Sequence, residues 1–242
     1  MIKAFILAAG LGTRLKQLTC NKPKALVLLN KKPLLEHTIL NLKSQGINDF
    51  IVNVHHFQDQ IINFLKEKNN FGCNIQISDE REKLLDTGGA LLFAKNKLKD
   101  AEHILIHNVD IFSDIDIKEF TANHIKNSAL ATLAVHSSNS SRKLSFNENM
   151  QLCMWKNIQT GEIKKIRNCN EKLSDFSFTG IHIISNEIFK HITETGKFSV
   201  IDLYLRLAEK HKIIGSKADY NYWFDLGRQE TLKRAENIIR KT

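Results

Sequence analysis

Short apolar runs alternate with amphipathic stretches along the first half of the chain. Residues 3–8 form an apolar run that leads into a glycine-rich turn, as expected for a buried parallel strand. Similar short runs occur at 50–54, 74–77, 103–107 and 129–135, and apolar residues recur at helical spacing between them. This alternation predicts βαβ units and a mostly parallel sheet, with ligands at the carboxyl ends of its strands.

The pattern changes after residue 135. A polar break at 137–141 is followed by three short strand-like runs, joined by turn residues, between 142 and 166, which predict antiparallel hairpins. A strand is expected again at 178–184, followed by helices at 186–191 and 200–211, a last strand at 222–224 and a helix at 229–240. We therefore expect one domain over residues 1–242. Its predicted fold class is α/β, with a Rossmann-like, mostly parallel central sheet flanked by helices and a small antiparallel insertion.

Composition excludes several classes of protein. The chain has 242 residues, of which 42% are hydrophobic and 25% charged, so a folded core is expected and disorder is not. Its apolar runs are far shorter than the roughly 20 residues that span a bilayer, and no secretory leader is recognisable, so we expect no membrane partner and a cytoplasmic location. Four scattered cysteines form no disulfide framework and no zinc-type spacing, and reduced thiols are expected.

The chain carries 35 basic and 26 acidic residues, a net charge of +9. Such a charge favours anionic partners, which include nucleic acid and small phosphorylated substrates. The basic residues are spread along the chain and often stand beside acidic ones. Because they form no basic face with interleaved aromatic residues, we expect no nucleic-acid partner.

The glycine turn after the first strand is the first candidate site. Gly10, Gly12 and Thr13 can present backbone N–H groups to a polyphosphate, and Arg14 follows within reach. A plain strand-to-helix turn with a solvated arginine would use the same residues. A Rossmann dinucleotide site is excluded, because Leu15 stands where the third glycine of that fingerprint is needed.

Four further segments offer candidate chemistry. Lys24 could bind phosphate, or be solvated, and residues 86–90 could hold a base or ribose at a helix start, or simply begin that helix. Asp110 and Asp225 each follow an apolar strand, where carboxylates can hold Mg²⁺. The neighbouring His55 and His56 would point to opposite faces of a strand, so a shared metal ion is not expected.

Taken together, these segments resemble the sugar-1-phosphate nucleotidyltransferases. The resemblance rests on residues 7–15, Pro23-Lys24, 86–89, 108–110 and 223–227, in that order. Within the family, the compact length and the Thr-Gly-Gly and Asp-Leu-Gly segments are most similar to N-acetylmuramate-1-phosphate uridylyltransferases, with mannose- or heptose-1-phosphate guanylyltransferases close behind. Residues 137–175 match poorly.

The resemblance implies a nucleotide-binding half at 1–135 and a sugar-binding half at 136–242. It also implies a role for each candidate residue. Arg14 and Lys24 would be catalytic residues, and Asp110 and Asp225 would bind Mg²⁺. Nucleotide binding would fall to Ala9, Gly10, Gly12, Thr13, Arg14, Thr87, Gly88 and Gly89. Sugar binding would fall to Thr179, Gly180 and Glu171, although the proline that usually follows the Glu-Lys pair is Leu173 here.

The implied reaction joins a nucleoside triphosphate and a sugar-1-phosphate, with Mg²⁺, and releases pyrophosphate. Its attacking phosphate oxygen is already ionised at neutral pH, so cations and a metal ion are needed rather than a general base. The expected substrates are UTP and an amino-sugar-1-phosphate such as N-acetylmuramate-1-phosphate. GTP with mannose- or heptose-1-phosphate is one alternative, and a non-catalytic nucleotide-sugar sensor is another. A monomer or small homo-oligomer is expected.

Overall fold

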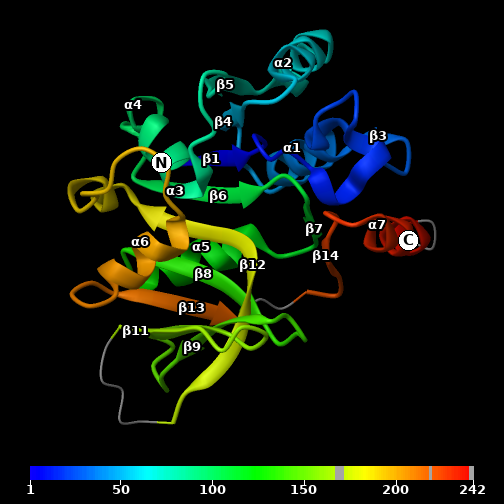
Figure 1. Ribbon diagram of the computed structural model, residues 1–242. Coiled ribbons are helices and arrows are strands. Elements are labelled where there is room, and N and C mark those ends of the chain that lie inside the picture. Colours follow the sequence, from blue (N-terminus) through cyan, green and yellow to red (C-terminus); the bar gives the residue numbers. More distant parts are fainter. Residues whose placement is uncertain (167–171, 218–219, 240–242) are drawn as a thin grey trace.

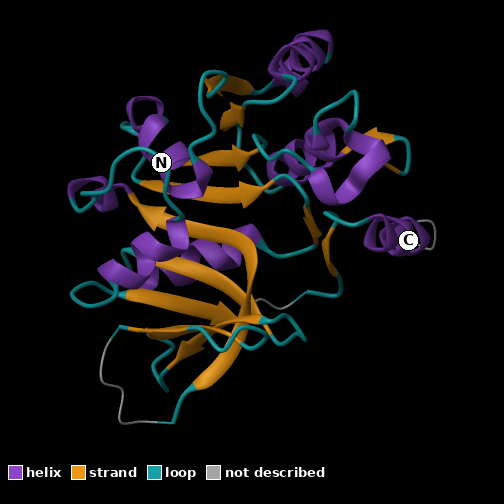
Figure 2. Ribbon diagram, in the orientation of Figure 1, coloured by secondary structure: helices purple, strands orange, loops and turns teal. Residues whose placement is uncertain are grey.

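A computed structural model of the chain describes residues 1–166, 172–217 and 220–239. Its central feature is a ten-stranded mixed sheet (Figures 1 and 2). Along its main path the strands are, in order, β11 (Ile163–Lys165), β10 (Leu152–Asn157), β9 (Arg142–Phe146), β12 (Ser174–Ser185), β6 (His103–Asn108), β1 (Ile2–Leu7), β4 (Asp49–Val54) and β5 (Asn74–Asp79).

The central strands are parallel, as predicted. β1 pairs in parallel with both β4 and β6, and β4 pairs in parallel with β5. The remaining two strands, β8 (Ala131–His136) and β13 (Ile213–Lys217), are also parallel to each other, and β8 attaches to the sheet through β12. The predicted α/β class with a mostly parallel centre and an antiparallel insertion is confirmed.

β12 joins the parallel and antiparallel parts of the sheet. Residues 181–185 of β12 pair antiparallel with β6, residues from 177 to 184 pair antiparallel with β8, and residues 174–176 pair with β9. The hairpins predicted between 142 and 166 are confirmed as β9, β10 and β11, which continue the sheet from this first part of β12. The chain after residue 135 therefore builds onto the same sheet as the first half (Figure 1).

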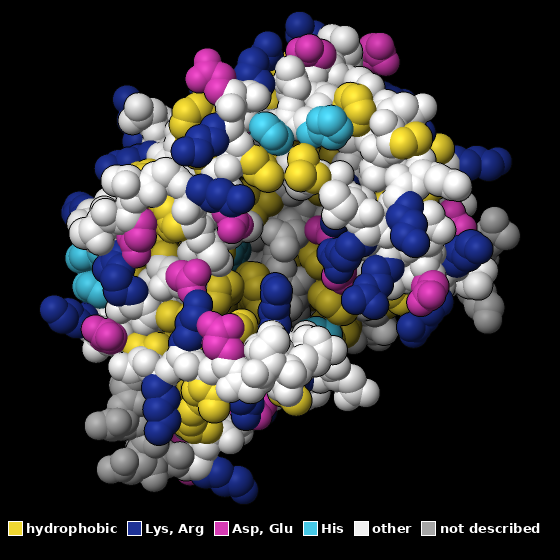
Figure 3. Space-filling model, in the orientation of Figure 1, with side chains coloured by type: hydrophobic (Ala, Val, Ile, Leu, Met, Phe, Trp, Pro, Cys, Tyr) yellow, Lys and Arg dark blue, Asp and Glu magenta, His cyan; other side chains and the backbone are white. Residues whose placement is uncertain are grey.

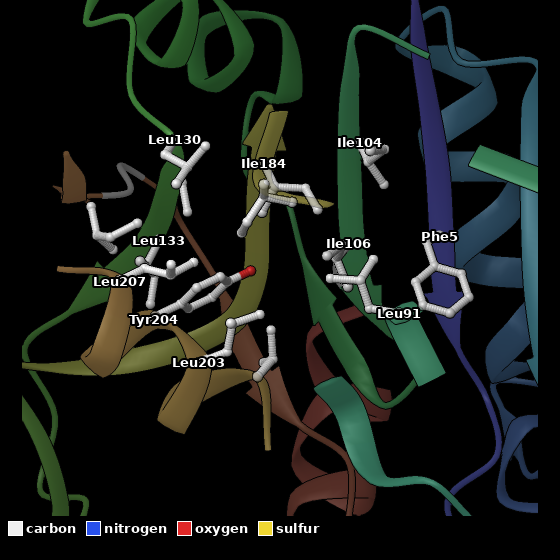
Figure 4. Close-up of a cluster of buried hydrophobic side chains, with 14 of the residues drawn as sticks. Phe5, Leu91, Ile104, Ile106, Leu130, Leu133, Ile184, Leu203, Tyr204 and Leu207 are labelled. Carbon is white, nitrogen blue, oxygen red and sulfur yellow. The ribbon is translucent and has the colours of Figure 1, made fainter. Parts of the chain in front are cut away.

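Helices cover both faces of the sheet, because alternate residues of each strand point to opposite sides. Phe5 and Ile106 pack on one side with α3 (Asp86–Phe93), α4 (Lys95–Leu98), the 3₁₀ turn η4 (Asn186–Lys190) and α6 (Val200–Leu207) (Figure 4). Ile6 and Leu105 pack on the other side with α1 (Leu34–Ser44), α2 (Gln58–Glu67) and α5 (Ile117–Lys126). Two apolar layers thus hold the parallel strands in place.

A third, smaller core lies beyond the sheet. It contains α7 (Gln229–Ile239), part of the 3₁₀ segment η1 (Thr13–Thr19), and a two-stranded ribbon of β2 (Leu28–Leu29) and β3 (Lys32–Pro33). A second ribbon pairs β14 (Trp223–Asp225) with β7 (Ile111–Ser113). The remaining 3₁₀ turns are η2 (Lys24–Leu26) and η3 (Asn69–Gly72).

Several local expectations need correction. The apolar run 25–29 has the pattern of a strand but begins as the 3₁₀ turn η2, and β13 and β7 were not predicted. The helix expected from residue 200 begins there as α6, and Ser199 caps it, since its hydroxyl accepts from the amide of Ile201. Cys20 and Cys73 are free thiols, as expected, whereas Cys153 is disulfide-bonded, which contradicts the expectation for that residue. No helix among residues 1–166, 172–217 and 220–239 has the length and apolar character to cross a membrane.

Candidate active site

The candidate site is a cavity of about 340 Å³ at the carboxyl ends of β1 and β6. Its walls come from the end of β1 with the glycine loop, from β4 and the segment after β5, from the start of α3, and from Asn108 and Asp110 after β6. Figure 3 shows the hollow in the middle of one face, with lysine and arginine side chains around it. The parallel strands therefore converge on the place where α/β sheets bind ligands.

The glycine loop is fixed at its base by a buried side chain of β4. Asn53 is 2% exposed, and its Oδ1 accepts from the amides of Ala8 (2.6 Å) and Ala9 (3.2 Å). A Cβ added to Gly10 would meet no atom within 4 Å, so this part of the loop is open. Gly12 has φ +66°, and its carbonyl accepts from the Thr19 hydroxyl at 3.0 Å. The hydrogen bonds from Ala8 and Ala9 to Asn53 therefore fix the base of the loop, while no protein atom fills the space next to Gly10.

A buried carboxylate completes this support. Glu80 is 3% exposed; its Oε1 accepts from the Asn53 amide at 2.9 Å, and its Oε2 accepts from the Leu85 amide at 3.3 Å. Burial raises the pKa of Glu80, which the hydrogen bonds from Asn53 and Leu85 partly oppose. Through Asn53 and Glu80, the end of β1 is connected to the segment that leads into α3.

Of the two predicted metal ligands, Asp110 lies in the turn between β6 and β7, and Asp225 ends the strand β14 that pairs with β7. Asp225 in β14 pairs with Ile111 of β7, and the amide of Leu226 donates to the carbonyl of Asp110 at 2.8 Å. Each carboxylate also meets one of the predicted catalytic cations: Lys24 Nζ forms an ion pair with Asp110, and Arg14 approaches Asp225 at 3.6 Å. The four residues thus form two ion pairs that are linked through the backbone bond from Leu226 to Asp110, and of the four Asp110 lines the cavity.

The two ion pairs differ in burial. The side chains of Lys24 and Asp110 are 11% and 14% exposed, whereas those of Arg14 and Asp225 are 53% and 40% exposed. Gly227 explains how Arg14 reaches its position, because a Cβ at residue 227 would lie 2.5 Å from the Arg14 guanidinium. The Asp-Leu-Gly segment thus supplies both a carboxylate and the space for a cation.

A match to a known family links this geometry to a chemistry. The family model described as "Nucleotidyl transferase" matches residues 3–242. The chain belongs to the nucleotidyl transferase family. The family expected from the sequence motifs is confirmed, and the protein is a nucleotidyltransferase.

Curated relatives of this nucleotidyltransferase differ in the substrates that their names state. An N-acetylmuramate α-1-phosphate uridylyltransferase of Caulobacter vibrioides is 27% identical over 96% of this chain and 95% of its own length. A probable mannose-1-phosphate guanylyltransferase of Oryza sativa is 34% identical, but over 55% of this chain and 38% of its own. A choline-phosphate cytidylyltransferase of Streptococcus pneumoniae is 51% identical over 33% of each chain.

Solved structures agree in fold. A putative glucose-1-phosphate thymidylyltransferase from Bacillus anthracis superposes with a TM-score of 0.82 at 19% identity, covering 100% of this chain and 96% of that one. HddC from Yersinia pseudotuberculosis, complexed with GMP-PN, gives 0.75 at 24% identity and covers 99% and 100%. At these identities the likeness supports the fold of this nucleotidyltransferase and not its substrate.

The Thr-Gly-Gly segment, predicted to bind nucleotide, forms hydrogen bonds with the segment that precedes α6. The amides of Gly88 and Gly89 donate to the carbonyl of Phe198 at 2.9 and 3.3 Å, and the Thr87 hydroxyl accepts from Val200 at 3.0 Å. A Cβ on Gly88 would lie 2.4 Å from the Phe198 ring. These glycines let the segment before α6 approach α3. Of the three predicted residues, Thr87 lines the cavity.

Predicted sugar-binding residues of β12 are also engaged in the fold. Thr179 is fully buried; its hydroxyl donates to the carbonyl of Ala134 at 3.0 Å, and its own carbonyl accepts from Trp223 Nε1 at 3.1 Å. Gly180 has φ +86°, and a Cβ there would lie 2.8 Å from the Asn108 amide group. Glu171 lies outside the described residues. Sugar binding at these three positions stays a prediction.

The remaining candidates take less central places. Thr13 is exposed at the start of η1 and does not line the cavity. His55 Nδ1 lies 2.7 Å from the carbonyl of Glu80, and the His56 ring packs on Phe57 with centroids 3.9 Å apart. Neither histidine lines the cavity, and only His55 bonds to a residue that does.

Sequence reasoning missed three polar residues of the cavity wall. Asn53 and Glu80 act through a contact between residues far apart in the sequence, and no local pattern marks it. Lys197 was not singled out because it stands in a loop, but it lines the cavity. A polar residue inside the apolar run 50–54 was the one available signal for Asn53.

The donor set suits a hard divalent cation. Asp110 and Asp225 offer carboxylate oxygens, and within the described ranges no group of three or more His, Cys, Asp or Glu side chains could hold a metal ion. Mg²⁺ is commonly held by one or two carboxylates together with substrate phosphates. Asp110 on the cavity wall, with Asp225 beside the Leu226 that bonds to its carbonyl, supplies carboxylates of this kind.

Proposed function

We propose that this nucleotidyltransferase joins UTP to N-acetylmuramate-1-phosphate, with Mg²⁺, and releases pyrophosphate. The observation that carries the proposal is the uridylyltransferase match, which extends over 96% of this chain and 95% of the relative. The meeting of Lys24 and Arg14 with Asp110 and Asp225 supports a site for a metal-bound polyphosphate.

Charge neutralisation is the main task of the proposed site. Two anionic substrates must approach each other, so cations close to both phosphates lower the barrier more than a base would. Asp110 and Asp225 would hold Mg²⁺, which when bound neutralises phosphate charge. Lys24 would turn from Asp110 towards the reacting phosphate, and Arg14 towards the leaving pyrophosphate.

The glycine loop would position the triphosphate. Asn53 fixes the Ala8 and Ala9 amides, so the loop is held before the substrate arrives. The open space above Gly10 lets phosphate oxygens approach the backbone, which no larger residue would permit. Lys197 adds a cation to the same cavity.

The proposal specifies both the base of the nucleoside triphosphate and the sugar-1-phosphate acceptor. The decisive experiment measures pyrophosphate release for UTP, GTP, CTP, dTTP and ATP against N-acetylmuramate-, mannose- and glucose-1-phosphate and phosphocholine, with the product identified by mass spectrometry. UTP with N-acetylmuramate-1-phosphate should give the highest kcat/KM. A clear preference for GTP with mannose-1-phosphate would replace this proposal, and nucleotide binding without turnover of any pair would indicate a sensor.

GTP is retained as the second candidate because the guanylyltransferase match reaches 34% identity, although it covers only 55% of this chain. We place the reaction in the cytoplasm, carried out by a monomer or small homo-oligomer without nucleic acid or membrane. Light scattering of the purified protein, and its retention on DNA and on vesicles at physiological salt, would test these points.

A further inference from the structure

A second cavity of about 310 Å³ lies between the antiparallel insertion and the start of α6. Strand pairing explains its first wall. Trp155 of β10 pairs with Leu144 of β9 and with Lys164 of β11, so the three side chains share one face of the insertion. Arg142, two residues before Leu144, points to that face as well. Ser199 and Asp202 of α6 stand opposite.

The cavity carries an excess of positive charge. Arg142, Lys143 and Lys164 line it together with a single carboxylate, Asp202. Lys164 is paired with that carboxylate at 2.8 Å. Lys143 is 8% exposed and donates to the Ser177 hydroxyl at 3.1 Å and to the Ser138 carbonyl. Because Lys143 lies between Arg142 and Leu144 on β9, its side chain points to the other face of the insertion, where it interacts with Asp175. Within the described parts of the chain Arg142 forms no ion pair, so it lines the cavity as a cation without an acidic partner.

The rest of the wall is apolar. Trp155, Phe178 and Leu144 line the cavity, and the Lys164 ammonium lies 5.3 Å from the centre of the Trp155 ring. Flat apolar walls suit the carbon face of a sugar ring, and hydroxyls at Ser140 and Ser199 can bond to its substituents. A volume near 300 Å³ is at the lower end of small-molecule sites, about the size for one monosaccharide.

The segment before α6 connects this cavity to the candidate active site. Lys197 lines the first cavity and Ser199 lines the second. Two hydrogen bonds tie this segment to α3. The carbonyl of Phe198 accepts from the amide of Gly88, and the amide of Val200 donates to the hydroxyl of Thr87. One short, firmly held stretch of chain is therefore shared by both cavities.

We propose that the second cavity binds the carboxylate-bearing part of an acidic sugar, with Arg142 as the residue that selects the acid. This inference rests on the proposed function in taking that sugar to be the acceptor. A neutral sugar-1-phosphate would leave Arg142 without a partner, whereas an acidic one would form a charge-assisted hydrogen bond. Acceptors that differ only in a lactyl ether should therefore be discriminated here.

The test compares N-acetylmuramate-1-phosphate with N-acetylglucosamine-1-phosphate in wild type and in Arg142→Met. The variant should raise KM for the acidic acceptor by about tenfold to a hundredfold, the range expected for a bond between charged groups. KM for UTP and for the neutral acceptor should change less than about twofold. Arg142→Lys, which keeps the charge, should recover part of the loss.

Lys165→Met is the matched control. Lys165 is exposed and neighbours Lys164 on β11, but it pairs with Met154 and so points to the other face of the insertion. Removing its charge should leave all three KM values unchanged. Equal KM changes for both acceptors, or equal effects of the two variants, would overturn the assignment of Arg142.

A binding measurement separates this inference from the proposed function. N-acetylmuramic acid without phosphate is titrated by calorimetry into wild type, Arg142→Met and Lys165→Met, with N-acetylglucosamine as the neutral reference. Binding of the acid that is lost in Arg142→Met alone would support the cavity even if no acceptor is turned over. Absence of binding to wild type, or binding that is retained in Arg142→Met, would refute it.

Discussion

Asp110→Asn and Asp225→Asn remove equivalent charges from the same site, yet they should differ in their effect on stability. Asp110 pairs with Lys24 where both side chains are 11–14% exposed, so the Asn variant leaves a nearly buried ammonium unpaired. Breaking a buried pair in this way costs about 3–5 kcal/mol. The Arg14–Asp225 pair is 53% and 40% exposed, and its loss should cost about 0–1 kcal/mol.

Thermal unfolding measures this difference directly. For a chain of this size 1 kcal/mol corresponds to roughly 2–4 °C in Tm, so Asp110→Asn should lower Tm by roughly 6–20 °C and Asp225→Asn by less than about 4 °C. The double variant Lys24→Met/Asp110→Asn removes both charges and should recover most of the loss, which appears as a coupling energy in a double-mutant cycle.

Both single variants should also lose turnover, because each removes a proposed metal ligand. Titration with Mn²⁺ in the presence of a non-hydrolysable nucleotide, followed by electron paramagnetic resonance, reads the metal separately from folding. Equal and small Tm shifts for the two variants would refute the reasoning from burial. Full activity in either variant would remove that residue from the metal site.

Three further predictions concern the loop, its arginine and the buried histidines. Gly10→Ala introduces a Cβ with no protein atom within 4 Å, so it should leave Tm unchanged and weaken nucleotide binding by calorimetry; unchanged affinity would place the phosphates elsewhere. Arg14→Ala should lower kcat by on the order of 10² with a Tm change under about 4 °C, and a normal kcat would exclude Arg14 from the chemistry. Burial lowers the pKa of His107 and His124 to about 4 and that of His182 to about 3, so the unfolded chain binds more protons below pH 6.5 and stability should fall from there towards pH 4. Urea unfolding should show a slope of about 1.4 kcal/mol per pH unit for each histidine, and His124→Gln should reduce it; a flat profile from pH 6 to 5 would contradict this.

Much of the fold was predictable because its determinants are local. The apolar run of β1, the turn at Gly10 and Gly12, and the hairpin turns of the insertion each carry their own pattern. β13 was missed because its glycine and serine weaken the apolar signal, and its place is set by pairing with β8. Residues 25–29 have the apolar pattern of a strand. The chain instead turns at η2, where Lys24 forms its ion pair with Asp110.

The candidate site divides in the same way. Strand-end carboxylates and the glycine loop could be found from position alone, and the structure pairs Asp110 with Lys24 and Asp225 with Arg14. The roles of Asn53 and Glu80 depend on contacts between β4, β1 and the segment after β5, which no window of sequence contains. Gly88 and Gly89 form a motif that is typical of ligand binding. In this structure the motif also leaves the space in which Phe198 packs against α3.

The placement of β14 affects when the protein becomes competent during synthesis. Asp225 enters the site on a strand that pairs with β7, outside the ten-stranded sheet, and is anchored through Trp223 to Thr179. Until β14 has emerged from the ribosome, Arg14 lacks its carboxylate and Leu15 lacks the packing of Phe224 and Leu226. Completion of this corner of the molecule therefore waits for the synthesis of β14 and α7, whereas the parallel strands β1, β4, β5 and β6 are made much earlier.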